Sequence, residues 1–275
     1  MSYGSIKAVW ITTGAFSCVI GLSCLSAIGQ AGEKTTSTPL EHAHSIPVLV
    51  ELFTSEGCSS CPPADEFVRK LDQLQPVAGG QLIVLSEHVD YWDHEGWKDP
   101  YSSSALTDRQ AAYEQVLGLN SPYTPQLIVD GAHEIHLADP KQIEEVFQRA
   151  VATPKIQVRL DGVSIDPAHS DLLCAHVAAD GGTGKSSANV YLAVALDHAE
   201  SQVLRGENGG RHLVHTAVVD QIVKVGKFEM GKEFAQDVKV KLKPGVDLLN
   251  LRVIAFVQAP GPGKLLGAAL WKGAH

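Results

Sequence analysis

The chain has 275 residues, of which 44% are apolar and 19% charged, and its formal net charge is −9. This length is sufficient for two domains of ordinary size. Nucleic-acid phosphates and anionic lipid headgroups repel a net negative chain that has no run of Lys and Arg. We therefore expect no nucleic-acid partner, and no membrane contact beyond the N-terminal anchor considered next.

The N-terminal segment has the pattern of an export signal. One lysine precedes an uncharged and largely apolar stretch over residues 8–28, and small residues follow up to Ala31. This pattern predicts a signal peptide over residues 1–31, cleaved after Ala31, and a periplasmic or secreted protein. The alternative is an uncleaved anchor, because the apolar stretch approaches the ~20 residues that span a bilayer. Residues 32–45, rich in Thr, Ser and His, are expected to form a flexible leader.

Residues 46–153 alternate between strand-like and helix-like segments. The strands are short, apolar runs, whereas the helices carry apolar residues at helical spacing and begin at Pro or Asp-Pro or end at Gly. This order predicts an α/β domain whose mixed sheet begins with parallel strands and closes with an antiparallel hairpin. The expected strands are residues 46–53, 81–89, 126–129 and 133–137, and the expected helices are residues 62–75, 105–117 and 139–151.

After Thr153 and Pro154 the pattern changes to strands alone, separated by Gly, Pro, Asp and Ser. No helix-like segment of any length interrupts them. Strands at this spacing predict an all-β, sandwich-like second domain over residues 154–275. The expected strands are residues 155–160, 172–178, 189–196, 211–225, 238–242, 248–257 and 265–270.

The cysteines favour one redox pair and one bystander. Cys18 and Cys24 would leave with the signal peptide, so the mature chain would keep Cys58, Cys61 and Cys174. A close pair and one distant single cysteine do not make a disulfide scaffold. Cys174 lies in a strand-like segment, where a free cysteine behaves as a small core residue.

The strongest chemical signal is Cys58-x-x-Cys61, placed between a buried strand and an amphipathic helix. Zinc uses the same spacing, but a zinc site would require further ligands at comparable spacing. The N-terminus of a helix stabilises the thiolate of a cysteine that lies just ahead of it, and the thiolate is the nucleophilic form. Cys58 is therefore the expected attacking thiol. Cys61, one turn inside, is the expected resolving thiol. The competing interpretation is a purely structural disulfide.

A second signal is Thr124-Pro125 before the third strand, where a proline is often cis. Taken together, this proline, the order of elements and the cysteine pair make residues 46–153 resemble the thioredoxin fold. That resemblance implies a cis Pro125, with Thr124 facing the sulfurs and both residues positioning the substrate. It also implies that Glu51, if buried, accepts a proton from the resolving cysteine. The sequence departs from thioredoxins in having Gly57 before the first cysteine and two serines between the pair.

The resemblance extends to a family of secreted thioredoxin-like proteins catalogued as domain of unknown function 1223. It covers nearly all of the mature chain and implies a fold and a redox role, but no substrate. The segments that carry it are residues 51–64, 89–93, 123–126 and 205–208.

An aromatic and acidic segment, residues 90–101, follows the second strand at the sheet edge where α/β proteins bind ligands. Tyr91, Trp92 and Trp97 are expected to form a substrate rim beside Cys58. A second interpretation is a copper or zinc site made by Cys58, Cys61, His88 and His94, with Asp90 and Asp93 nearby. A third is a loop whose aromatic side chains pack on their own domain.

The turn over residues 205–212, Arg-Gly-Glu-Asn-Gly-Gly-Arg-His, is a candidate contact with the cysteine pair. No hydrolase, P-loop or dinucleotide-binding motif occurs, so we expect no cofactor. Together these patterns predict a cell-envelope thiol–disulfide oxidoreductase acting on protein thiols and disulfides. The alternatives are a metal-binding or metal-delivery protein and a non-enzymatic binding module with a structural disulfide.

Overall fold

A computed structural model describes residues 45–183 and 187–273. The predicted signal peptide and, apart from Ser45, the predicted leader lie outside the described residues. Within these two ranges, none of the helices is long and apolar enough to cross a membrane.

The first half of the chain forms the expected alternation of strands and helices. The helix ends follow local sequence: Pro62 and Pro63 open the first helix, Asp139 caps the third through the N–H of Gln142, and Gly118 ends the second at φ 68°. The elements are β1 (Ile46–Thr54), α1 (Pro62–Leu74), β2 (Gly80–His88), α2 (Ser104–Leu117), β3 (Gln126–Val129), β4 (His133–Ile135) and α3 (Pro140–Ala152).

The second half contains all seven expected strands, most of them longer than predicted. The hairpin of the third and fourth is the longest and continues well beyond the predicted ends. The elements are β5 (Val158–Asp166), β6 (His169–Ala179), β7 (Ser187–Gln202), β8 (His212–Glu229), β9 (Phe234–Lys241), the 3₁₀ helix η1 (Leu248–Asn250), β10 (Leu251–Gln258) and β11 (Leu265–Lys272).

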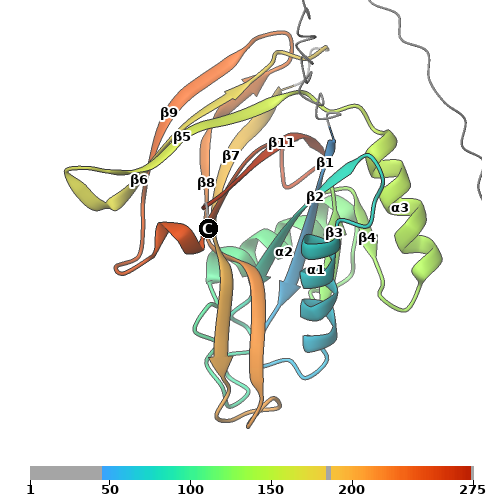
Figure 1. The fold of residues 1–275 in the computed structure, drawn as a ribbon. Coiled ribbons are helices and arrows are strands. Elements are labelled where there is room, and N and C mark those ends of the chain that lie inside the picture. The colour runs from blue at the N-terminus through green and yellow to red at the C-terminus, as the bar shows by residue number, and fades with distance from the viewer. Residues whose placement is uncertain (1–44, 184–186, 274–275) are drawn as a thin grey trace, which may run out of the picture. The chain divides into compact units, whose positions relative to one another are not determined.

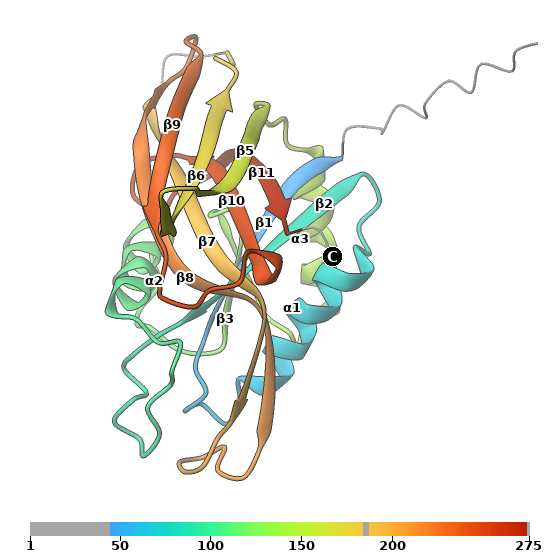
Figure 2. The same cartoon turned by 60° about the vertical axis from the view of Figure 1, so that its left-hand side comes forward.

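The strands form two sheets (Figures 1 and 2). The larger is an eight-stranded mixed sheet in the order β11-β10-β7-β8-β2-β1-β3-β4, and the smaller has the order β5-β6-β9. β1 runs parallel to β2 and antiparallel to β3, as expected for the first half. β2 and β8 join in parallel through one pair, Ser86 and Val218. The mixed sheet predicted for the first half is therefore confirmed, and it continues into the second half.

Side-chain alternation gives the large sheet two apolar faces. One face packs against α1 and α3 over β1 and β3, and against the small sheet over β7 and β10. The opposite face carries Leu49 and Ile83 from the first half next to Ala193, Ile254 and Phe256 from the second. Both faces are thus covered, as their continuous apolar strands require.

The sheet and the core both cross the boundary predicted at Thr153 and Pro154. All described residues belong to one compact unit. The change of pattern at this point marks a change in the type of element, because the second-half strands β7, β8, β10 and β11 extend the first-half sheet. No local sequence pattern indicates the pairing of β2 with β8, because it joins Ser86 to Val218, 132 positions apart in the chain.

Candidate functional site

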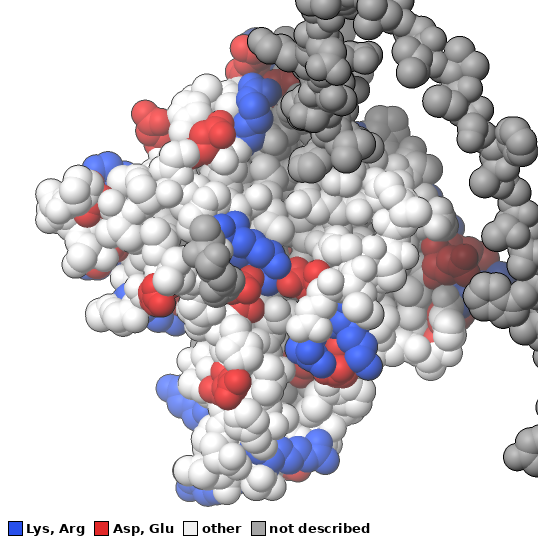
Figure 3. All heavy atoms as spheres, viewed as in Figure 1, with Lys and Arg blue, Asp and Glu red and all other residues white. Residues whose placement is uncertain are grey.

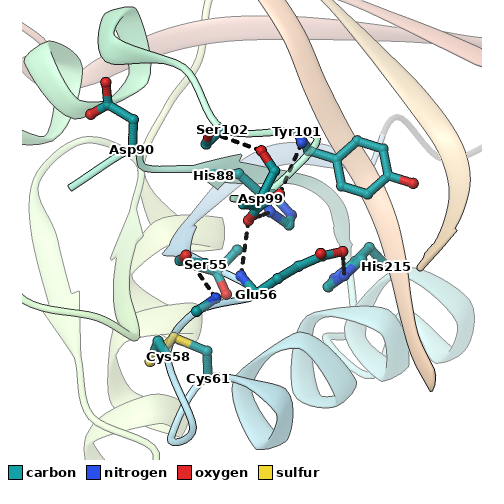
Figure 4. Close-up of polar contacts among 12 residues, drawn as sticks. Ser55, Glu56, Cys58, Cys61, His88, Asp90, Asp99, Tyr101, Ser102 and His215 are labelled. Atoms are coloured by element: carbon teal, nitrogen blue, oxygen red, sulfur yellow. Dashed lines mark hydrogen bonds and ion pairs between the residues drawn. A yellow bond between two sulfur atoms is a disulfide. The ribbon is translucent and has the colours of Figure 1, made fainter. Parts of the chain in front are cut away.

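Cys58 and Cys61 form a disulfide at the start of α1, with their Cα atoms 5.4 Å apart (Figure 4). The strand β1, buried from Val48 to Thr54, leads into this loop, and Cys61 is the N-terminal cap residue of α1. Ser59 and Ser60 between them are exposed, whereas both cysteines are completely buried. The Ser60 hydroxyl lies 3.3 Å from Cys58 Sγ, which places a hydrogen-bonding group beside that sulfur.

The Thr124–Pro125 segment faces this disulfide from the loop that precedes β3. Its peptide bond is cis, and the Thr124 carbonyl oxygen lies 3.8 Å from Cys58 Sγ. The indole N–H of Trp92 donates to the Thr124 hydroxyl at 2.8 Å. The structure thus brings three sequence-predicted site residues, Cys58, Thr124 and Trp92, into one contact network.

The turn between β7 and β8 contacts the cysteine loop from the other half of the chain. The Ser59 N–H donates to Glu207 Oε2 at 3.0 Å. Asn208 donates its side-chain amide to the main-chain oxygens of Glu56 and Cys58, each at 2.9 Å, and is completely buried. The candidate contact suggested by the Arg-Gly-Glu-Asn motif therefore exists in the structure.

A buried ionic group, which we call the Glu56 cluster, lies next to the cysteine loop (Figure 4). It consists of Glu56, Asp65 of α1 and His215 of β8. His215 Nε2 lies 3.2 Å from Glu56 Oε1, and its Nδ1 lies 3.7 Å from Asp65 Oδ1. Burial alone would lower the pKa of His215, but Asp65 and Glu56 raise it to about 9. At neutral pH His215 is therefore a cation, and it lies between two buried acidic side chains.

A second histidine–carboxylate pair adjoins this cluster. His88 Nδ1 lies 2.7 Å from Asp99 Oδ2, and both side chains are fully buried. Asp99 also accepts the Glu56 N–H at 2.8 Å, which ties the pair to the cysteine loop. Burial tends to raise the pKa of Asp99, but His88 and the main-chain N–H groups of Glu56 and Tyr101 lower it. The His88 ring lies edge-on to His215, with centroids 4.8 Å apart.

Glu51 is buried, as its proposed role requires, but its side chain engages other partners. Its carboxylate contacts the Arg109 guanidinium and the Tyr113 hydroxyl of α2. Arg109 also lies 3.5 Å from Glu87 of β2. We call Glu51, Glu87, Arg109 and Tyr113 the Glu51 cluster. Arg109 and Tyr113 thus bind the Glu51 carboxyl group, and none of its hydrogen bonds within the described residues goes to either cysteine. Its expected role in proton transfer stays a prediction.

Glu87 differs from its neighbour in this cluster. Burial, together with the nearby Glu51 charge, raises the pKa of Glu87 well above its usual value, although Arg109 opposes the shift. Among the described residues, neither oxygen of the Glu87 carboxyl group has a hydrogen-bond partner. The pKa of Glu87 is therefore shifted in the direction that favours its neutral form.

The three aromatic residues of the expected rim are distributed differently. Trp92 packs against the residue that precedes Cys58, since a Cβ added at Gly57 would lie 3.0 Å from the Trp92 Cβ. Tyr91 is half-buried, and burial raises its pKa. Trp97 donates its indole N–H to Glu56 Oε2 at 2.8 Å, so its polar atom is already used by the Glu56 cluster.

The residues of the alternative metal site do not gather. His88 is buried against Asp99, and His94 is exposed. Over residues 45–183 and 187–273, no group of three or more His, Cys, Asp and Glu side chains is arranged to hold a metal ion. Cys174 is a free cysteine of intermediate burial in β6, 4.0 Å from Asp166, rather than a fully buried core residue.

Four residues that the sequence analysis did not assign belong to this site: Asp65, Asp99, Asn208 and His215. Asp99 and Asn208 lay inside segments that the sequence singled out, but their buried positions had no local signal. Asp65 and His215 interrupt otherwise apolar periodic patterns of a helix and a strand, which is the one sequence signal that could have identified them.

The comparisons with known proteins complete this description. A crystal structure from Agrobacterium tumefaciens, determined as a structural genomics target, is 28% identical over 84% of this chain and 96% of that chain, with a TM-score of 0.63. This neighbour shares the fold of the mixed sheet and its second sheet.

Two further solved structures are much more distant. A domain of the outer membrane lipoprotein Omp28 from Porphyromonas gingivalis is 15% identical over 43% of this chain and 88% of that chain, with a TM-score of 0.27. The sporulation control protein Spo0M from Bacillus subtilis is 12% identical over 44% of this chain and 49% of that chain, with a TM-score of 0.29. No curated protein matches the chain. The family model described as "Protein of unknown function (DUF1223)" matches residues 49–258, and the chain belongs to that family.

Proposed function

We propose that this protein is a thiol–disulfide oxidoreductase of the cell envelope, built on a thioredoxin-like first half and acting on protein thiols and disulfides. The observation that carries the proposal is the Cys58–Cys61 disulfide at the start of α1, with the Thr124 carbonyl 3.8 Å from Cys58 Sγ. The order β1-α1-β2, with β1 and β2 parallel, supports the thioredoxin-like interpretation.

In the reduced protein, Cys58 is the proposed nucleophile. It lies ahead of α1, whose unpaired N–H groups favour a thiolate, and the Ser60 hydroxyl lies within reach of its sulfur. The Cys58 thiolate attacks a substrate disulfide, forming a mixed disulfide and releasing one substrate thiolate. Cys61 then attacks the Cys58 sulfur, which closes the Cys58–Cys61 disulfide and releases the second substrate thiolate.

The test is to trap the mixed disulfide. Cys61→Ser removes the resolving thiol, so cells that express the variant should accumulate disulfide-linked adducts on non-reducing gels. Cys58→Ser/Cys61→Ser is the matched control and should give none. Equal adduct patterns for the two variants would contradict the oxidoreductase function.

Complete burial of both cysteines favours one alternative, a binding module with a structural disulfide. The reduction potential of the pair separates the two functions. Structural disulfides in secreted proteins have potentials below about −300 mV, whereas catalytic pairs range from about −270 to about −120 mV. A potential in the catalytic range supports the proposal, and a value below this limit supports the structural alternative.

A further inference from the structure

The turn that joins β7 to β8 is a preformed structure. Its ends are closed by main-chain hydrogen bonds from Val203 to Arg211 and from Gly210 to Val203, at 3.0 and 2.8 Å. Gly206 has φ +76°, and a Cβ at this position would lie 3.2 Å from both Glu95 O and Trp97 Cβ. Only glycine therefore allows the turn to pack this closely on the aromatic segment.

This turn contacts the cysteine loop through two adjacent side chains. Asn208 bridges the carbonyl oxygens of Glu56 and Cys58, on either side of Gly57, and so fixes the loop main chain that carries the first cysteine. Glu207 accepts the Ser59 N–H. Hydrogen bonding by the Ser59 side chain, together with this N–H, lowers the pKa of Glu207, so a carboxylate is present here at neutral pH.

Asn208 is unusual because it is fully buried in a turn whose other residues from Leu204 to Gly210 are exposed. The hairpin of β7 and β8 carries it to the start of α1 (Figures 1 and 2). His215 of β8 comes from the same hairpin and contacts Glu56 of the same loop, with its Nε2 3.2 Å from Glu56 Oε1. The hairpin therefore holds the cysteine loop at both Glu56 and Cys58.

We propose that Asn208 and Glu207 are positioning residues that hold the cysteine loop closed and control the access of thiols to the Cys58–Cys61 disulfide. The inference rests on the proposed function. A thiolate must approach a disulfide sulfur directly, yet neither Cys58 nor Cys61 has exposed surface while the turn contacts the cysteine loop. Release of the turn frees the main chain around Cys58 and opens the sulfurs to a substrate.

The experiment measures reduction of the disulfide in the full-length oxidised protein by dithiothreitol. Two electrons and two protons pass to the pair, leaving the thiols of Cys58 and Cys61 and cyclic oxidised dithiothreitol. Samples are quenched with an alkylating reagent and the rate is read by mass. Because it requires no physiological partner, this readout is independent of adduct trapping.

Asn208→Ala should accelerate reduction on the order of tenfold to a hundredfold, since two hydrogen bonds to the loop are lost. Glu207→Ala removes one exposed contact and should give a smaller acceleration of about threefold to tenfold. Glu207→Gln keeps an acceptor for Ser59 and should restore most of the slow rate. Arg205→Gln is the matched control, because this exposed residue of the same turn has no polar contact with the loop, and its rate should be unchanged.

Unfolding rates measured in parallel distinguish access from general instability. Reduction that remains first order in dithiothreitol and faster than global unfolding supports the proposal. Unchanged rates for both Asn208→Ala and Glu207→Ala would overturn it, as would acceleration that only follows the rate of global unfolding. Fast reduction without trapped adducts would leave the control of access in place and contradict only the oxidoreductase function.

Discussion

The Glu56 cluster and the Glu51 cluster both stabilise buried acidic side chains, in two different parts of the fold. Each holds two buried carboxyl groups beside one cation, His215 in the first and Arg109 in the second. Only the Glu56 cluster reaches the cysteine loop, through Glu56 itself. The difference shows that burial of an acid near β1 does not by itself give it a role at the sulfurs.

The origin of the compensating groups also differs between the clusters. Arg109 belongs to α2 in the first half of the chain, whereas His215 belongs to β8 in the second. The Glu51 cluster also receives a second-half residue, since Gln258 donates to Tyr113 at 2.8 Å and accepts from Arg109 at 3.2 Å. Both clusters therefore depend on the second half, and the Glu56 cluster depends on it for its only cation.

The largest expected effect follows from removing the second half. A chain that ends at Thr153 lacks His215 and Gln258, and it exposes the apolar face around Leu49 and Ile83. The alternation of strands and helices in residues 46–153 favours independent folding of the first half. Because both halves contribute to one apolar core, we instead expect the isolated first half not to fold. The fragment should show no cooperative thermal transition and little near-ultraviolet circular dichroism, in contrast to the full chain. A cooperative transition with an intact disulfide would show that the first half is a separate domain.

A substitution at Arg109 tests the Glu51 cluster alone. Arg109→Met should lower the free energy of unfolding by about 3–5 kcal/mol, because it leaves the buried Glu51 carboxylate without its cation. Urea unfolding at pH 7 measures the effect. Glu87→Gln is the matched control, and because the pKa shift of Glu87 favours its neutral form, this variant should change stability by less than about 1 kcal/mol. Equal losses for both variants would contradict the assignment of charge within the cluster.

The smallest expected effect is a pH dependence that belongs to the Glu56 cluster. The pKa of His215 is raised from about 6.5 in the unfolded chain to about 9 in the fold. Its contribution to stability is therefore complete below pH 6.5 and is lost as the pH rises towards 9, by roughly 1–3 kcal/mol. Urea unfolding between pH 6 and pH 9.5 should show this decline.

A matched variant assigns the decline to the histidine. His215→Gln should flatten this part of the pH profile, whereas His212→Gln, an exposed histidine on the same strand, should leave it unchanged. A decline of the same size in His215→Gln would show that other groups cause it. The cation of the Glu51 cluster adds nothing to this decline, because Arg109 stays charged throughout the range.

The visible surface carries no comparable segregation of charge. In Figure 3, acidic and basic side chains are interspersed over the face shown. Several exposed side chains of the described residues pair directly, such as Arg159 with Asp180 and Lys232 with Glu229. Exposed pairs of this kind contribute little to stability. The buried clusters are therefore the places where single substitutions should have large effects.

The sequence by itself determined the elements and the cysteine pair, because these depend on local patterns. Apolar runs and helical spacing placed β1 through α3 and the seven later strands, and proline and glycine placed the helix ends. The segment around Cys58 and Cys61 was likewise marked by its position between a strand and a helix.

Only the tertiary structure decided which residues surround that pair. Glu51 had a suitable spacing from Cys58, but Arg109 holds it elsewhere, and neither the strand nor the helix pattern records that contact. Asn208 and His215 reach the cysteine loop across 150 or more residues. Such contacts follow from the pairing of β8 with β2, which is a property of the whole sheet and has no signature in any short segment.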